Sequence, residues 1–282
     1  MNEINKTLYI PLYGKATVSK KGIILNDTKA EEIWEKEGFE LHGKSKSKWL
    51  TYYMAMRAKV FDDWTKAQLQ TYSNAIVLHI GCGMDSRIER ISNINNLWYD
   101  IDFPQVIEER KKYYNESNNY KMFCADASKA EWLSELPKVE NAIVIMEGIG
   151  MYLTTQQLSQ LFIALQKQFK RVNLLADFYT VFGAKASKYK NPINDVGVTS
   201  VSGLDEPKLL EENNGIQFIN EKTMTPPDLI NQLKGAERIF FKVMFGGKFA
   251  RKTYRLYEYE IFNEKLTKGG SYERIHNPTQ SH

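Results

Sequence analysis

Residues 75–87 read AIVLHIGCGMDSR, and this stretch decides the fold. The apolar run 75–80 is typical of a buried strand, which breaks at Gly81-Cys82-Gly83 before a helix begins. Small residues at such a turn let the backbone approach a ligand that any larger side chain would obstruct. We therefore predict that Gly81, Cys82 and Gly83 line a nucleotide-cofactor site.

The pattern continues outward from this turn as alternating strands and helices. We expect five strands, which lie at residues 75–81, 96–102, 120–126, 141–148 and 171–179. Apolar runs separated by helical segments predict a parallel sheet that is covered on both faces. Two further runs, 237–244 and 254–262, have only a short glycine-rich link between them, which permits an antiparallel pair and forbids a parallel crossover. The prediction is an α/β fold with a seven-stranded, mostly parallel sheet and an antiparallel C-terminal strand pair.

The flanking segments are expected to form a cap, a lid and a tail. Residues 1–26 read as irregular, a helix is predicted from the N-cap Asp27 to Glu37, and a longer helix over residues 48–71. We take residues 1–74 as an N-terminal helical cap and 75–262 as the catalytic domain. Within that domain, the polar stretch 180–225 is a lid insertion, and 263–282 is a tail. The aromatic residues Trp49, Tyr52, Tyr53 and Phe61 recur at helical spacing and are expected to pack on the sheet.

Acidic residues end three successive strands after the glycine turn. They are Asp102, Asp126 and Glu147. Ligands of open parallel sheets bind at the carboxyl ends of the strands, near the point where the strand order reverses. We therefore expect these three carboxylates and the glycine turn to meet at one ligand site.

The residues beside the turn indicate which ligand this is. A dinucleotide fingerprint has glycine or alanine where this chain has Ser86, and the Asp85 carboxylate would repel a pyrophosphate. S-adenosylmethionine carries no phosphate and fits better. Asp102 would accept its ribose hydroxyls, while Asp126 and the backbone of Ala127 would contact the adenine edge. An NAD-dependent oxidoreductase and a non-catalytic cofactor-binding protein remain the alternatives.

Four segments together resemble the leucine carboxyl methyltransferase family, and in particular its bacterial branch of tetracenomycin-type polyketide O-methyltransferases. They read GCGMDSR (81–87), YDIDFP (99–104), CADA (124–127) and EGIGMYLT (147–154), and they occur in the family's order. The resemblance implies a Rossmann-like class I S-adenosylmethionine-dependent methyltransferase. It also implies that Asp102 holds the ribose, that Glu147 lies near the methionyl amine and that Arg57 lies near the methionyl carboxylate. At Ala127 the family has a larger residue.

The acceptor is expected to be a carboxylate or phenol on a small molecule, polyketide-like or peptide-borne. Such groups need little base catalysis, which suits a chain with four histidines. His79 is predicted to be a buried core residue, so His42 is the one candidate base, and no catalytic residue is assigned. No metal is expected, because no cluster of histidines and carboxylates occurs in the sequence.

The composition and the N-terminal sequence exclude further classes of partner. The chain of 282 residues is 43% hydrophobic and has a net charge of +4, with no basic stripe interleaved with aromatic residues, so no nucleic-acid partner is expected. The N-terminus does not resemble a signal peptide, and no apolar run approaches transmembrane length. We expect no membrane partner, a cytoplasmic location and, with two cysteines, no disulfide framework. The oligomeric state is left open.

Overall fold

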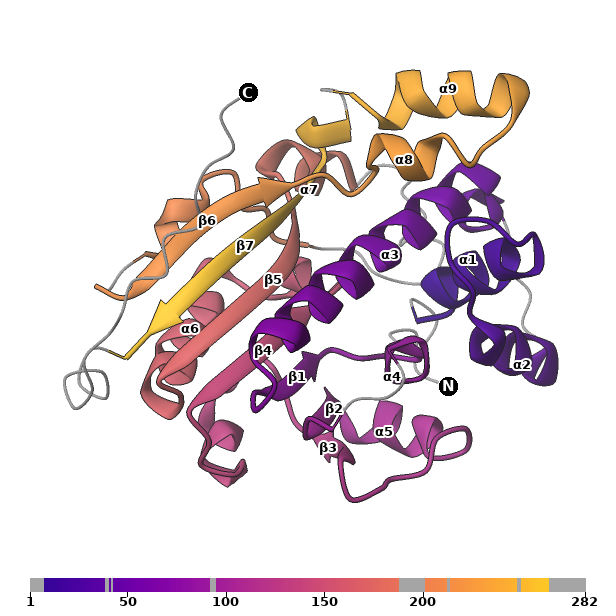
Figure 1. The fold of residues 1–282 in the computed structure, drawn as a ribbon. Helices are drawn as coiled ribbons and strands as arrows, with labels where there is room; N and C mark the ends of the chain where they lie inside the picture. The colour runs from indigo at the N-terminus through magenta and orange to yellow at the C-terminus, as the bar shows by residue number, and fades with distance from the viewer. Residues whose placement is uncertain are drawn as a thin grey trace.

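A seven-stranded sheet forms the centre of the molecule (Figure 1). The computed structural model describes residues 8–38, 41, 43–91, 95–187, 201–211, 214–247 and 250–263, and these residues form the sheet in the order β3-β2-β1-β4-β5-β7-β6. The strands β1 to β5 are parallel to one another, and β7 is antiparallel to both of its neighbours. The strands are β1 (Ile76–Ile80), β2 (Trp98–Asp102), β3 (Tyr120–Cys124), β4 (Asn141–Met146), β5 (Arg171–Tyr179), β6 (Ile216–Lys222) and β7 (Tyr254–Phe262).

Helices cover both faces of the sheet, and further helices lie beyond one end of it. They are α1 (Tyr9–Lys20), α2 (Thr28–Glu37), α3 (Lys48–Thr71), α4 (Arg87–Arg90), α5 (Pro104–Arg110), α6 (Thr155–Gln168), α7 (Val181–Ser187), α8 (Pro227–Ile230) and α9 (Gly235–Phe245). The predicted bounds of α3 are confirmed, and so is the Asp27 cap, whose carboxylate accepts the N–H of Ala30 at 2.9 Å. No helix within the described ranges is long and apolar enough to cross a membrane.

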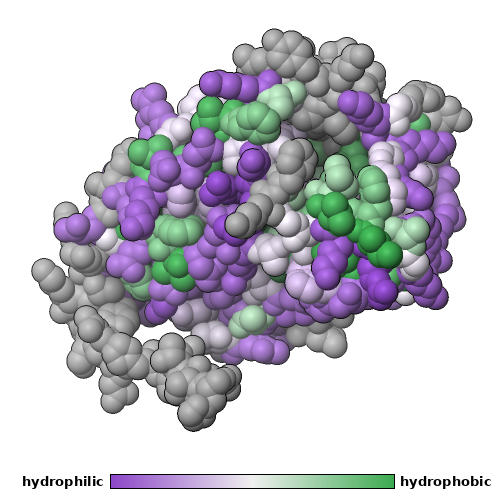
Figure 2. Space-filling view, turned by 90° about the horizontal axis from the view of Figure 1, so that it is seen from above, coloured by the Kyte–Doolittle hydropathy of each residue, from purple (hydrophilic) through white to green (hydrophobic). Residues whose placement is uncertain are grey.

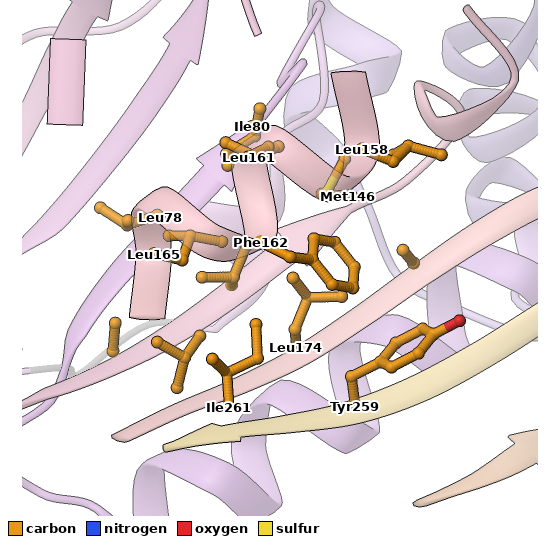
Figure 3. Close-up of a cluster of buried hydrophobic side chains, with 14 of the residues drawn as sticks. Leu78, Ile80, Met146, Leu158, Leu161, Phe162, Leu165, Leu174, Tyr259 and Ile261 are labelled. Carbon is orange, nitrogen blue, oxygen red and sulfur yellow. The ribbon is translucent and has the colours of Figure 1, made fainter. Parts of the chain in front are cut away.

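Alternate residues of the central strands supply two separate cores. On one face, Leu78 and Met146 pack with Leu158 and Phe162 of α6, as Figure 3 shows. On the opposite face, Val77 belongs to a second cluster with residues of α3 such as Phe61 and Trp64. Because successive side chains of a strand point to opposite faces, a strand between two helical layers is buried along its whole length. The five residues of β1 are buried for this reason.

Three local predictions were wrong. Residues 237–244 belong to the helix α9 and not to a strand, and the antiparallel partner of 254–262 is β6, which had been assigned to the insertion 180–225. Residues 9–20, expected to be irregular, form the helix α1. The segment 237–244 has apolar residues at spacings that suit either structure, and the packing of Phe241 against Tyr52 and Phe245 selects the helix. Residues 188–200 of the predicted lid and 264–282 of the predicted tail lie outside the described residues.

Candidate active site

A cavity of about 1090 Å³ lies at the carboxyl ends of the central strands, where the strand order reverses between β1 and β4. Pockets for small ligands usually measure about 300–1,000 Å³, so this one has room for a cofactor and a small acceptor. All eight residues predicted to bind the cofactor line it. They are Arg57, Gly81, Cys82, Gly83, Asp102, Asp126, Ala127 and Glu147.

The glycine turn after β1 depends on glycine at two positions. Gly81 and Gly83 have φ angles of 69° and 51°, a left-handed backbone that disfavours other residues. A Cβ on Gly81 would lie 2.5 Å from Cδ1 of Ile149, and one on Gly83 would lie 2.9 Å from Cδ2 of Leu8. The turn is thus enclosed by the segment after β4 on one side and by the residue that precedes α1 on the other.

Asp102 at the end of β2 faces the same turn. Its carboxylate accepts the backbone N–H of Gly83 at 2.8 Å and that of Phe103 at 2.8 Å. Burial raises the pKa of Asp102, and the two backbone hydrogen bonds oppose that shift. A carboxylate accepts about four hydrogen bonds, so the group retains acceptor capacity for a diol.

Asp126 and Ala127 form the wall of the cavity after β3. One carboxylate oxygen of Asp126 accepts both the N–H and the hydroxyl of Ser128, at 2.9 and 2.7 Å. These contacts fix the turn that presents Ala127 and its backbone to the cavity. The small side chain of Ala127 leaves this wall less filled than a larger residue would.

Glu147, after β4, joins two buried arginines. Its Oε1 lies 3.0 Å from Nε of Arg57, and its Oε2 accepts a hydrogen bond from Arg87. Burial alone would raise the pKa of Glu147, but Arg57 and Arg87 outweigh burial and hold it below its usual range. Glu147 is therefore an ionised carboxylate at the cavity wall.

Asp177 in β5 is a further acidic residue near the carboxyl end of a strand, and the sequence did not predict it. Its carboxylate accepts a hydrogen bond from Nη1 of Arg57 at 3.0 Å and from the N–H of Gly148 at 2.7 Å. Burial raises its pKa to about 6, against the opposing charge of Arg57. Asp177 lies two residues before the end of β5, so a search confined to the last residues of strands does not find it. Of the Arg57 nitrogens, Nη2 makes no hydrogen bond to a described residue and lies 3.4 Å from the position of a Cβ on Gly148.

Asp85 lies beside the glycine turn, where cations surround its carboxylate. Its carboxylate is buried and ion-paired with Lys15 of α1 at 2.9 Å and with Arg90 of α4 at 2.9 Å. Burial opposes ionisation, yet these cations and Arg87 hold the pKa of Asp85 well below its usual range. Because the negative charge is neutralised locally, Asp85 repels a pyrophosphate less than the sequence argument supposed. Lys15 itself lines the cavity, and nothing in the pattern of residues 1–26 indicated it.

His79 is buried, as predicted, and both ring nitrogens are engaged. Nδ1 lies 3.0 Å from Asp100 and Nε2 lies 3.1 Å from Arg87. Arginine can only donate, so Nε2 accepts and Nδ1 carries the proton, which makes this imidazole neutral. Cys82 is also buried, and burial raises the pKa of its thiol well above the ordinary value. Neither residue has the properties of a nucleophile or of a free base.

The other half of the cavity is aromatic and apolar. Trp49 and Tyr53 of α3 line it, which the prediction that they pack on the sheet did not include. Phe61 packs on the sheet as predicted, whereas Tyr52 packs against Phe241 of α9 and not on the sheet. Tyr254, at the start of β7, lines it as well, and its hydroxyl lies 3.3 Å from Nη1 of Arg57. This half would surround a flat or apolar group.

These groups fit S-adenosylmethionine residue by residue. Asp102 offers acceptor positions for a diol, and the Asp126–Ala127 turn offers backbone groups for an adenine edge. Nη2 of Arg57, which has no hydrogen-bond partner among the described residues, offers donors for a carboxylate. The strand order and the antiparallel β7, together with this site, define a class I methyltransferase.

The model of the leucine carboxyl methyltransferase family matches residues 7–166, and the chain belongs to that family. It is an S-adenosylmethionine-dependent methyltransferase. The chain is 25% identical over 238 residues to the tetracenomycin polyketide synthesis O-methyltransferase of Streptomyces glaucescens, covering 83% of this chain and 88% of that protein. It is 25% identical over 231 residues to an S-adenosyl-L-methionine-dependent methyltransferase of Gibberella zeae, covering 73% and 77%.

Solved structures agree on the fold. A DUF574 family protein from Streptomyces avermitilis superposes with a TM-score of 0.52 at 9% identity, covering 84% of this chain and 90% of that one. The resemblance to the methyltransferase family predicted from the four sequence segments is confirmed, and the NAD-dependent oxidoreductase and non-catalytic alternatives are set aside.

Proposed function

We propose that this enzyme transfers a methyl group from S-adenosylmethionine to an oxygen of a small acceptor, and that the oxygen belongs to a carboxylate or a phenol. The observation that carries the proposal is the state of His79. It is the one histidine among the described residues, and Asp100 and Arg87 engage both of its ring nitrogens. The candidate base His42 lies outside the described residues. A carboxylate is ionised at neutral pH without help, and a phenol needs little, whereas an alcohol needs a positioned base.

In this proposal, the residues of the chain bind the cofactor and orient the acceptor. Asp102 would hold the ribose, Asp126 and Ala127 the adenine edge, Glu147 the methionyl amine, and Arg57 the methionyl carboxylate. Bound S-adenosylmethionine supplies a methyl group that is already activated by a sulfonium. Trp49 and Tyr53 would then position the acceptor and exclude water, which is what a methyl transfer chiefly requires.

The aromatic half of the cavity favours an aromatic acceptor. The similarity to the tetracenomycin polyketide synthesis O-methyltransferase of Streptomyces glaucescens favours a polyketide-like one.

The test is methylation with S-adenosylmethionine labelled in its methyl group, across matched aromatic acids, phenols and alcohols. A methyl ester releases volatile methanol in mild alkali, and an aryl methyl ether does not. We expect labelled product from acids or phenols and none from the matched alcohols. Product from the alcohols alone would refute the proposal.

A further inference from the structure

The helix α9 exposes most of its apolar residues. Ile239 is 65% exposed, Phe240 44%, Val243 69% and Met244 39%, and Phe241 is the one buried residue of this helix. At about 100° per residue, the four exposed side chains occupy an arc of about 140°. We call these four residues the α9 patch. Figure 2 looks onto this side of the molecule and shows hydrophobic side chains gathered together with hydrophilic ones at their edge.

The remaining sides of α9 explain why the patch points outward. Glu237 binds Lys48 and Tyr52 of α3 at 2.9 and 2.8 Å, and Phe241 packs edge-on against Tyr52. These contacts hold one side of α9 on the start of α3. On the flank beside Ile239 lie Arg238 and Lys242, both exposed.

The α9 patch continues into the cavity. Phe240 packs on Trp49 with ring centroids 4.4 Å apart, and Trp49 lines the cavity. Met244 belongs both to the patch and to the cavity lining. Apolar side chains therefore connect the acceptor half of the cavity to the outside of α9.

We propose that α9 docks this enzyme on an anionic lipid surface, with the mouth of the cavity toward the lipid. A helix with an exposed apolar face and cationic residues along its edge lies in the interface plane of a membrane. Four side chains are too few for a stable protein partner, which needs about 20 residues a side. A two-fold contact through the patch would also bring Arg238 and Lys242 toward their own copies, where like charges repel. No membrane partner was expected because the sequence has no run of transmembrane length, and an interfacial helix does not need such a run.

Docking in this orientation suits an acceptor that partitions into lipid, because the acceptor could enter the cavity across Met244 and Trp49 without crossing water. This consequence rests on the proposed function, whereas the docking itself does not.

The experiment is co-sedimentation of the whole chain with vesicles of phosphatidylcholine alone or with 30% phosphatidylglycerol, without acceptor. The variant Ile239→Gln/Val243→Gln removes apolar contacts, and Leu209→Gln, at another exposed apolar residue (57%), is its control. The variant Arg238→Gln/Lys242→Gln removes charge, and Lys66→Gln/Lys138→Gln is its control.

We expect binding to anionic vesicles that is at least about tenfold tighter than to neutral ones, and a loss of about tenfold or more in each α9 variant. The controls should bind as the unaltered protein does. Equal binding to both vesicle types, or unchanged binding in the α9 variants, would overturn the proposal. So would a dimer in light scattering that Ile239→Gln/Val243→Gln dissociates without any vesicle binding. An unaltered melting shift with S-adenosylhomocysteine shows that each variant is folded, and it reports on the cofactor site independently of lipid.

Discussion

The carboxylate of Asp27 accepts the hydroxyl of Ser86, whose oxygen lies 2.5 and 2.6 Å from the two carboxylate oxygens across 59 residues of chain. The same carboxylate caps α2 through the N–H of Ala30 and lies 2.6 Å from Nη1 of Arg90. One buried side chain thus attaches the N-terminal helices to the loop that follows β1.

We expect Asp27→Ala to destabilise the fold by about 2–4 kcal/mol, because it removes a helix cap and leaves Arg90 with less compensation. Asp27→Asn should cost less, since an amide oxygen still caps α2. Urea unfolding measures both variants. Asp63→Ala, at a side chain that is 55% exposed, is the control and should change stability by no more than about 0.5 kcal/mol. Equal midpoints for Asp27→Ala and Asp63→Ala would show that the contact with Ser86 contributes nothing.

The role proposed for Asp102 predicts a loss of cofactor affinity. Asp102→Ala removes a charged acceptor worth about 1.5–3 kcal/mol, so S-adenosylhomocysteine should bind about 10–100-fold more weakly in calorimetry. Asp102→Asn retains one acceptor oxygen for the N–H of Gly83, so its affinity should lie between those of the parent protein and Asp102→Ala. Glu108→Ala, a nearby acid whose side chain is 68% exposed, should bind normally. An unchanged affinity in Asp102→Ala would remove this residue from the cofactor site.

The sequence was sufficient where local chemistry determines the structure. The N-cap Asp27 and the helix over residues 48–71 are found where they were predicted. Asp102 and Gly83 meet as predicted, because the ends of adjacent parallel strands lie at the same edge of a sheet. These conclusions need only the neighbours along the chain and the rule for strand ends.

The sequence was insufficient where contacts distant in the chain decide. The segment 237–244 is a helix because Phe241 and Glu237 find partners on α3, and nothing near them in the sequence shows that. The edge strand β6 is largely polar on its outer side, so its sequence reads as a loop. Lys15 reaches the site because α1 packs over the glycine turn, and its charge pairs with Asp85 only in the folded chain.

Gly83 should not tolerate a side chain. Gly83→Ala places a Cβ 2.9 Å from Cδ2 of Leu8 on a backbone with φ of 51°, which costs about 1 kcal/mol or more. We expect weaker binding of S-adenosylhomocysteine in calorimetry. The added variant Leu8→Ala removes the clash and leaves the backbone strain, so the double variant should recover part of the affinity. Gly22→Ala is the control, since its φ of 65° is similar but a Cβ there meets nothing within 4 Å. Normal binding by Gly83→Ala would contradict the enclosure of the turn by Leu8.

Asp100 should make the stability of the fold depend on pH in the acidic range. Although burial acts in the opposite direction, Arg110 and His79 lower the pKa of Asp100 from 3.8 to about 2. A carboxyl whose pKa is lower in the folded state contributes stability above its unfolded pKa and loses it as the pH falls through the folded one. The contribution is about 2 kcal/mol at neutral pH, and it should disappear between about pH 4 and pH 2. Urea unfolding of the parent and Asp100→Asn across this range should show a difference that shrinks as the pH falls. A difference that does not vary with pH would contradict the role of Asp100.

Arg57 should stabilise the site chiefly by compensating two carboxylates. Its guanidinium lies 3.0 Å from Glu147 and 3.0 Å from Asp177, so Arg57→Met leaves two buried acids without their cation and should cost about 3–5 kcal/mol. Adding Glu147→Gln removes one of those charges. The double variant should therefore lose about 1–3 kcal/mol less stability than the two single variants lose together.

The same variant predicts a pH dependence of definite sign. Burial already raises the pKa of Asp177 to about 6, and Arg57 opposes that shift. Without Arg57 the pKa of Asp177 rises further, and a carboxyl with a raised folded-state pKa gains stability as the pH falls through it. Arg57→Met should therefore unfold at a higher urea concentration at pH 5 than at pH 8, relative to the parent protein. Arg57→Met/Asp177→Asn lacks the titrating group and should lose that difference. If the double variant keeps it, the pH dependence belongs to a group other than Asp177.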